Sequence, residues 1–270
     1  MSGAIEQGRG LMTPFAALLW GWGGMAVVMT LLWIVQKVRG DAGIVDAAWA
    51  AGIGALSVFF AVEMDGDPRR RIAVACVAGL WAVRLARHVL VRVLTMPEDG
   101  RYTKLREQWG EKAQAYLFGF FQLQAFWAVL FAAPMLIASR NPKPFPSATD
   151  FAALAVWLNA VLGEAVADRQ LQRFRRDPAN RGKVCQAGLW ASSRHPNYFF
   201  EWTHWFTYVL LSAGAPLWWL SLMGPALMLW FLLKVTGIPP TEEQALRSRG
   251  DAYREYQRTT NAFFPGPRKK

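Results

Sequence analysis

Three long stretches without a charged side chain constrain this chain most. Residues 10–36, 113–139 and 202–233 contain no Asp, Glu, Lys or Arg. Each stretch exceeds the roughly 20 apolar residues that a helix needs to cross a bilayer. A helix also satisfies its own backbone hydrogen bonds, which lipid cannot do. The pattern therefore predicts an all-α, polytopic helical membrane protein.

We expect about seven transmembrane helices in a single membrane domain. The second would contain Asp46, and the third Arg84, Arg87 and His88. The last charge-free stretch is divided near Pro216, because proline interrupts a helix; a single bent hairpin is the alternative there. The predicted spans are residues 12–36, 42–62, 71–95, 113–139, 150–174, 197–214 and 216–235.

The charge balance predicts the orientation. The chain carries 30 Lys and Arg against 19 Asp and Glu, yet it is 53% hydrophobic, which is unusual for a soluble nucleic-acid binder. Most basic residues fall in loops 92–112 and 169–196 and in the tail 236–270, which share one side if seven spans are present. The positive-inside rule then places the C terminus in the cytoplasm and the N terminus outside. We expect the bacterial inner membrane and no nucleic-acid or obligatory protein partner.

Several common chemistries are excluded. Two cysteines, Cys76 and Cys185, cannot form a disulfide scaffold or a Cys-rich zinc site, and three histidines offer few other metal ligands. The dinucleotide-binding, P-loop, zinc-protease and nucleophile-elbow motifs are missing. We therefore predict no metal, and any nucleotide would be held by scattered side chains. Arginine suits phosphate because its planar fork donates two hydrogen bonds.

Polar residues at helical spacing indicate where such a ligand would bind. Glu164, Asp168 and Arg175 share one face of the fifth predicted helix, and Asn197 and Glu201 share one face of the sixth. Charged groups at membrane depth are costly and normally mark function. Two alternatives stay open: the arginines could anchor anionic headgroups, and the charged groups could pair structurally.

The most specific segment is residues 182–201, GKVCQAGLWASSRHPNYFFE. It resembles the C-terminal signature of the steroid 5-alpha-reductase family, especially its uncharacterised bacterial branch. The resemblance covers roughly residues 40–265. The other segments that fit are Asp41 to Trp49, Asp99 to Tyr102, Asp168, Arg175 to Pro178, Gly237 to Pro239, Glu242, Glu243, Tyr253, Tyr256, Phe264 and Pro265.

This resemblance implies a membrane-embedded, NADPH-dependent reductase of the 3-oxo-5-alpha-steroid 4-dehydrogenase type, acting on CH–CH groups. Such an enzyme transfers a hydride to the double bond of an α,β-unsaturated ketone. In the family, a Gln-Glu pair and a Tyr polarise the ketone. Here Asp46 resembles the Glu, Val45 stands at the Gln position, and Arg84 stands near the Tyr position. We therefore expect Asp46 and Arg84 to be catalytic.

The resemblance also implies the cofactor residues. Asn197 and Glu201 match residues suited to the nicotinamide carboxamide and ribose, whereas Asp168 and Arg175 match the adenosine side. Arg194 and His195 match less directly. The full set that we expect to bind NADPH is Arg87, Arg101, Tyr102, Asp168, Arg175, Arg176, Arg194, His195, Asn197, Tyr198, Glu201 and Glu242.

Two other functions remain open. Arg194-His195-Pro196-Asn197-Tyr198, followed by Glu242-Glu243, also resembles membrane methyltransferases of the isoprenylcysteine and phospholipid type, which use S-adenosylmethionine. A non-enzymatic lipid-binding protein is the third possibility. The phosphates of NADPH need cations, whereas S-adenosylmethionine is itself cationic, and this difference favours the reductase.

The mechanism expected from these residues has two forms. An apolar steroid, hopanoid, isoprenoid or fatty acyl lipid enters from the bilayer between spans one and four. Asp46, kept neutral by desolvation, donates a hydrogen bond to the substrate carbonyl. If Arg84 contacts Asp46 instead, the two form a cationic clamp for the enolate oxygen.

Overall fold

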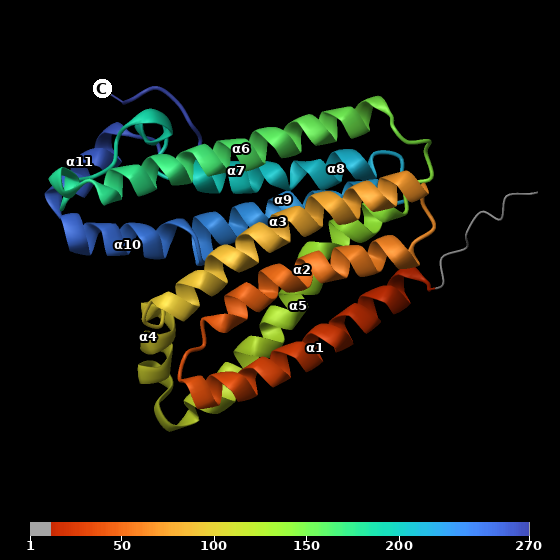
Figure 1. Ribbon diagram of the computed structural model, residues 1–270, viewed down its shortest axis with the longest axis horizontal. Helices are drawn as coiled ribbons and strands as arrows, with labels where there is room; N and C mark the ends of the chain where they lie inside the picture. The colour runs from red at the N-terminus through yellow and green to blue at the C-terminus, as the bar shows by residue number, and fades with distance from the viewer. Residues whose placement is uncertain (1–11, 270) are drawn as a thin grey trace, which may run out of the picture. The chain divides into compact units, whose positions relative to one another are not determined.

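A computed structural model describes residues 12–269, which contain helices and no strand. The all-helical prediction is thus confirmed for this part of the chain (Figure 1). Short 3-10 turns and one π turn, Phe231–Val235, connect or extend the α-helices. The helices are α1 (Pro14–Arg39), α2 (Ile44–Glu63), α3 (Pro68–Thr95), α4 (Gly100–Trp109), α5 (Ala113–Ser139), α6 (Ala148–Arg176), α7 (Pro196–His204), α8 (Phe206–Ser212), α9 (Met223–Trp230), α10 (Ile238–Arg249) and α11 (Asp251–Thr259).

Six helical segments of the described chain are long and apolar enough to cross a membrane. They are Pro14–Arg39, Ile44–Glu63, Pro68–Thr95, Gly100–Ser139, Ala148–Arg176 and Trp218–Arg249. The additional predicted span, 197–214, consists of α7 and α8, which are interrupted at Trp205. The count of seven and the topology stay predictions, and the N terminus with Arg9 lies outside the described residues.

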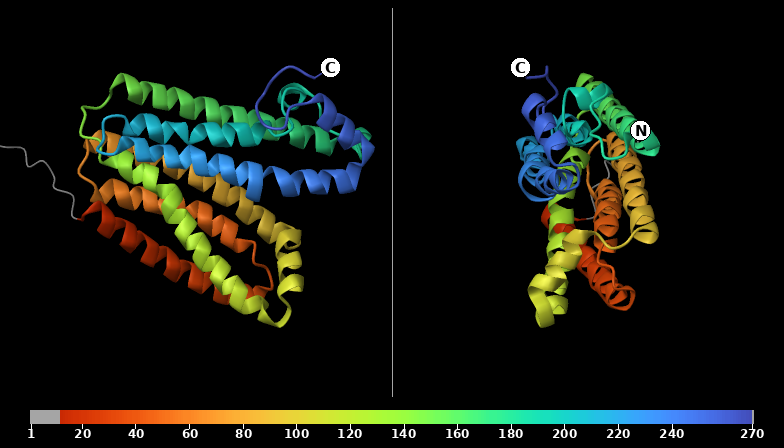
Figure 2. Two further views of the ribbon diagram at one scale, coloured as in Figure 1. Left: turned by 180° about the vertical axis from the view of Figure 1, so that it is seen from behind. Right: turned by 90° about the vertical axis from the view of Figure 1, so that its left-hand side faces the viewer.

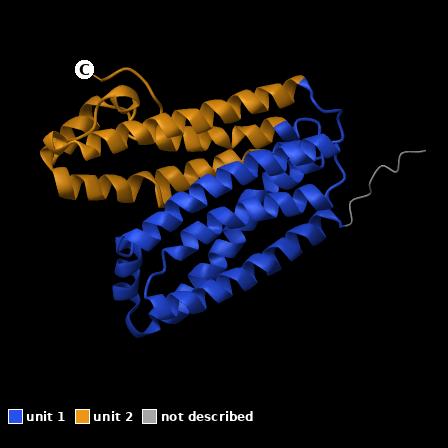
Figure 3. Cartoon of the chain, viewed as in Figure 1, with its two compact units in different colours: residues 1–147, 211–221 blue, residues 148–210, 222–270 orange. Residues whose placement is uncertain are grey.

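The chain divides into two compact units (Figure 3). Unit 1 comprises residues 1–147 and 211–221, and unit 2 comprises residues 148–210 and 222–270. The expectation of a single membrane domain stays a prediction.

In unit 1, α2 is the central helix. It packs against α1, α3 and α5. As a result, 56% of an apolar 18-residue stretch of α2 is buried, compared with 17% of the corresponding stretch of α1. Small residues allow the close approach, since a Cβ at Gly54 would collide with Ala82 of α3. The exposed sides of α1 and α3 carry large apolar residues, among them Trp20 and Val83. Such faces suit lipid rather than water.

Polar contacts join α1 to α5. The buried Gln36 side chain donates to the side-chain oxygen of Gln114 over 2.7 Å. Further along, Gln122 donates to the hydroxyl of Thr30 over 3.0 Å. These two helices are the first and fourth predicted spans, between which we expected substrate to enter. In this structure hydrogen bonds connect them.

In unit 2, α7 lies between α6 and α9 (Figure 2). Gly163 makes the contact with α6 possible, because any Cβ there would overlap the ring of Phe200 on α7. The segment before α7 is also tied to α6: Trp190 Nε1 donates to the carbonyl of Ala167 over 2.9 Å. These contacts fix the start of α7 against the middle of α6.

Candidate functional site

Predicted site residues lie in one cluster of polar side chains in unit 1 and in two such clusters in unit 2. In unit 1, α1 ends at Gly40, whose φ of 73° suits glycine. The chain then turns into α2 with Asp46 in the first helical turn, where the helix dipole favours a carboxylate. Asp99 is the N-cap of α4 and accepts a hydrogen bond from the backbone N–H of Arg101 over 3.0 Å. Two helix starts therefore supply this cluster.

Asp46 contacts Arg101 and Tyr102 of α4. Arg101 Nη2 donates to Asp46 Oδ2 over 3.0 Å, and the Tyr102 phenol donates to Asp46 Oδ1 over 2.8 Å. Arg84 is not among the partners of Asp46, so the alternative of an Asp46–Arg84 clamp does not apply to this structure. The physical reason is that α4 folds back over the start of α2 and brings a different arginine to the carboxylate.

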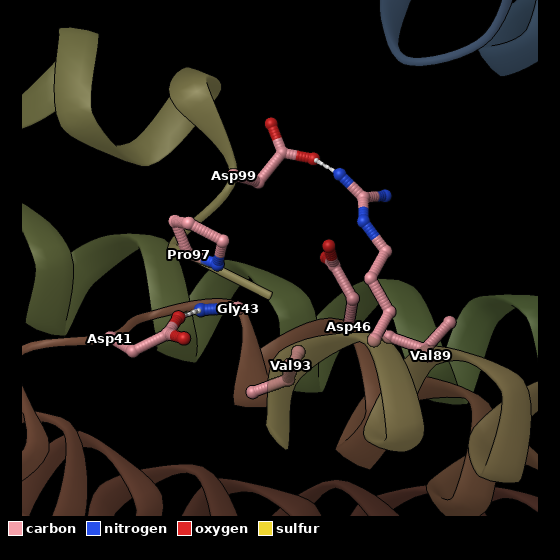
Figure 4. Close-up of a pocket in the computed structure, with 8 residues that line it drawn as sticks. Asp41, Gly43, Asp46, Val89, Val93, Pro97 and Asp99 are labelled. Carbon is pink, nitrogen blue, oxygen red and sulfur yellow. Dashed lines mark hydrogen bonds and ion pairs between the residues drawn. The ribbon is translucent and has the colours of Figure 1, made fainter. Parts of the chain in front are cut away.

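Asp99 completes the cluster. Its carboxylate accepts from Arg101 Nε over 3.2 Å and from Arg92 Nη2 over 2.5 Å. Burial alone would raise the pKa of Asp99, but hydrogen bonds and charge from Arg101, with the charge of Arg92, lower that pKa below its ordinary value. A pocket opens beside this group (Figure 4). Its lining residues are Asp41, Gly43, Asp46, Val89, Arg92, Val93, Pro97 and Asp99.

Hydrogen bonds hold the guanidinium of Arg101 in place, but they use only two of its three nitrogen atoms in the described residues. Asp46 and Asp99 accept from its Nε and Nη2 atoms. Within residues 12–269 no hydrogen bond uses Nη1, and 38% of the side chain is exposed. Arg101 can therefore donate to an oxygen of a bound molecule while both carboxylates fix its position.

In unit 2, the structure brings Asn197 and Asp168 together. Pro196 begins α7 because its fixed φ suits the first helical position, and Asn197 follows it. Asn197 Nδ2 donates to Asp168 Oδ1 over 3.3 Å. The opposite atom, Asn197 Oδ1, is buried and accepts no hydrogen bond from the described chain. A buried acceptor without a donor is costly, so this oxygen is suited to a ligand N–H.

A second network in unit 2 surrounds Glu242 of α10. Arg194 Nε donates to Glu242 Oε1 over 2.7 Å, and Arg194 Nη1 donates to the carbonyls of Gln257 and Thr260. Arg194 is only 8% exposed. Its donors are therefore directed mainly at the protein, as expected for a residue that joins chain segments.

His195 and Tyr198 belong to the same network. His195 Nε2 lies 3.2 Å from Glu242 Oε1, and the His195 ring is parallel to that of Tyr198 at 5.3 Å between centroids. The Tyr198 hydroxyl lies 3.1 Å from that of Thr241. The network thus connects the start of α7 with the first turn of α10.

The other predicted residues are distributed over both units. Arg84 and Arg87 lie on α3 in unit 1. Arg175 and Arg176 are exposed at the end of α6 in unit 2, and neither donates a hydrogen bond to the described residues. Glu201 follows Asn197 by one turn of α7.

Asp99, Arg92, Gln257 and Tyr253 were not among the predicted site residues. Asp99 had a detectable signal, since an aspartate before Gly100 is a typical helix N-cap. Tyr253 and Gln257 also had one, because residues four apart share a helix face. Gln257 donates to Glu242 Oε2 over 2.8 Å, and the Tyr253 hydroxyl donates to Glu242 Oε1 over 3.4 Å.

These findings define a class of protein: a helical protein with spans apolar enough for a membrane and polar clusters at helix starts. The chain belongs to the DUF1295 family, described as proteins of unknown function, whose family model matches residues 32–260. It is similar to an uncharacterised protein of Schizosaccharomyces pombe, with 26% identity over 88% of this chain and 77% of the yeast protein. No solved structure matches.

Proposed function

We propose that this protein is a membrane-embedded, NADPH-dependent reductase of the carbon–carbon double bond in an α,β-unsaturated ketone of a lipid. The observation that carries the proposal is the Asn197 side chain. Asp168 orients its amide, and its buried oxygen lacks a donor within the described residues. The resemblance of residues 168–201 to the steroid 5-alpha-reductase signature supports the same assignment.

The residues of unit 2 fit a nicotinamide dinucleotide. A nicotinamide carboxamide carries an N–H2 group, which is the donor that Asn197 Oδ1 lacks. Arg175 and Arg176 offer guanidinium groups for phosphate, and Asp168 holds the Asn197 amide in one orientation. When bound, NADPH would supply the hydride. The side chains of the protein bind and orient it.

We propose separately that the unit 1 cluster binds an oxygen atom of a lipid. Arg101 would donate from Nη1 to that oxygen. Asp46, Tyr102 and Asp99 are positioning residues in this proposal, because each contacts Arg101 or the carboxylate that holds it. Asp46 accepts two hydrogen bonds, so its role differs from the proton-bearing donor expected from the sequence.

The methyltransferase is the competing function. The Arg-His-Pro-Asn-Tyr segment suggested this function. Arg194 of that segment, however, donates to three acceptors within the protein itself. Binding of S-adenosylmethionine also gives no role to the exposed Arg175 and Arg176, because that cofactor is itself a cation. These two observations favour the dinucleotide.

Cofactor binding tests the proposal directly. We expect NADPH, but not S-adenosylmethionine, to raise the unfolding temperature of the detergent-purified protein. Asn197→Asp should weaken NADPH binding at least about tenfold, or about 1.4 kcal/mol, because it replaces a neutral amide with a carboxylate. Gln244→Glu, which adds the same charge at an exposed position of α10, is the matched control. Stabilisation by S-adenosylmethionine alone would overturn the proposal.

A further inference from the structure

His195 is buried in unit 2 with its ring held on two sides. Only 3% of the residue is exposed. Nε2 points to Glu242 Oε1 at 3.2 Å, and Tyr198 stacks parallel to the ring with an interplanar angle of 4°. The backbone N–H of His195 donates to the Ser193 hydroxyl over 3.1 Å. Both the position and the rotation of the imidazole are thus fixed.

Glu242 determines which nitrogen of His195 carries hydrogen. Its carboxylate accepts from Arg194, Gln257 and Tyr253, and is therefore an acceptor toward His195 as well. Nε2 is then the donor. Nδ1 has no hydrogen-bond partner anywhere in residues 12–269, so it is the nitrogen left for exchange of a proton.

The charged and titratable groups around this ring are Arg194, Glu242, Tyr253 and Tyr198. Arg194 is cationic, but it pairs with the same carboxylate as His195. Burial and the Glu242 carboxylate raise the pKa of Tyr253 well above its ordinary value, so that phenol is neutral. Tyr198, the remaining titratable neighbour, binds Thr241. Glu242 can therefore stabilise an imidazolium, as carboxylates do in histidine-based proton transfer.

We propose that His195 is the proton donor of the reduction and that Glu242 is its positioning residue; this inference rests on the function proposed above. Addition of a hydride to the β-carbon leaves a carbanion equivalent at the α-carbon, which needs one proton. The Nδ1–H bond of the imidazolium breaks and the α-carbon–hydrogen bond forms. The neutral imidazole then recovers a proton from water. In total, the double bond gains one hydride and one proton, and the product is a saturated ketone.

Turnover and cofactor binding together test this role. The probe is 4-cholesten-3-one in detergent micelles with NADPH in deuterated water, and the readout is deuterium at the α-carbon. His195→Gln should lose at least about 100-fold in turnover, the contribution typical of a general acid, while its NADPH affinity falls far less. His88→Gln, at an exposed position of α3, is the control.

A second readout needs no substrate. The chain has three histidines, so nitrogen-15 spectra of labelled protein can be assigned with single His→Gln variants. We expect His195 to carry hydrogen on Nε2 when neutral, and Glu242→Gln to weaken this preference because the carboxylate acceptor is lost. The Glu242→Gln variant should also lower turnover, because the imidazole of His195 is no longer held in this orientation.

The outcomes distinguish failure of the His195 inference from failure of the reductase proposal. A wild type that binds no NADPH overturns the reductase proposal, and the inference falls with it. A wild type that binds NADPH while His195→Gln reduces the probe normally overturns the inference alone. A neutral His195 with hydrogen on Nδ1 would overturn it as well, whatever the turnover.

Discussion

The phenol of Tyr102 donates a 2.8 Å hydrogen bond to the carboxylate of Asp46, and this bond joins the first turn of α4 to the first turn of α2. Tyr102 is 2% exposed, so the contact is shielded from water. Because Asp46 also holds Arg101, this tyrosine contributes to the orientation of the guanidinium, which lies over the Tyr102 ring at 5.6 Å from its centroid.

Removal of the Tyr102 hydroxyl should therefore affect both stability and substrate binding. We expect Tyr102→Phe to lower the free energy of unfolding by about 1–2 kcal/mol, because a buried hydrogen bond is lost. KM for an enone probe should rise while NADPH affinity stays constant. Tyr116→Phe, at a residue 50% exposed on α5, is the control for thermal unfolding in detergent. Equal effects of the two variants would contradict this role.

Asp99 should make the stability of unit 1 depend on pH. Its pKa is lower in the folded protein than in the unfolded chain, so its ionised form stabilises the fold above the unfolded pKa of about 4. This contribution is lost as the pH falls through the folded value. Asp99→Asn should thus lower the unfolding temperature at neutral pH, and the difference from the wild type should shrink in acid. A constant difference between neutral pH and pH 3 would argue against the carboxylate.

Gly163 should be required for the geometry of Asn197. A methyl group at this position would overlap Phe200 and push α7 away from α6. We expect Gly163→Ala to cost about 1–3 kcal/mol, as overpacked sites do, and to weaken NADPH binding. Gly119→Ala on α5 is the matched helical control, since a Cβ there meets no atom within 4 Å. That control should be neutral or slightly stabilising.

Arg194 should hold the C-terminal segment in place. Arg194→Lys keeps the charge but loses the fork that reaches Glu242 and the carbonyls of Gln257 and Thr260. We expect a loss of about 2–4 kcal/mol, because buried acceptors are left without donors. Limited proteolysis should then cut between α11 and the C terminus, while Arg247→Lys, which is exposed on α10, should behave like the wild type.

Local features of the fold could be read from the sequence, but the contacts of the sites could not. The charge-free stretch 113–139 coincides with α5, because an apolar segment of that length has few alternatives to a helix. Periodicity also placed Asn197 and Glu201 on one helix. It could not show that Asp46 pairs with residues 101 and 102 rather than with Arg84, because that choice depends on how α4 folds back.

The sequence likewise did not indicate the helix break at Trp205 or the structural role of Arg194. Trp205 lies in an apolar stretch without proline or glycine beside it, so nothing local indicated that α7 ends before it. Arg194 lies next to a histidine in a segment that suggests ligand binding. Its main partners come from residues 242–260, and only the folded chain brings them near.

The contacts of the C-terminal segment also set an order of assembly. The backbone N–H of Arg194 donates to the carbonyl of Asn261, and the hydroxyl of Ser193 donates to that of Phe263. During synthesis, residues 192–195 leave the ribosome long before these acceptors exist. The motif around His195 can therefore reach its final geometry only after residue 263 has been synthesised, and a nascent chain stalled before residue 260 would lack these contacts.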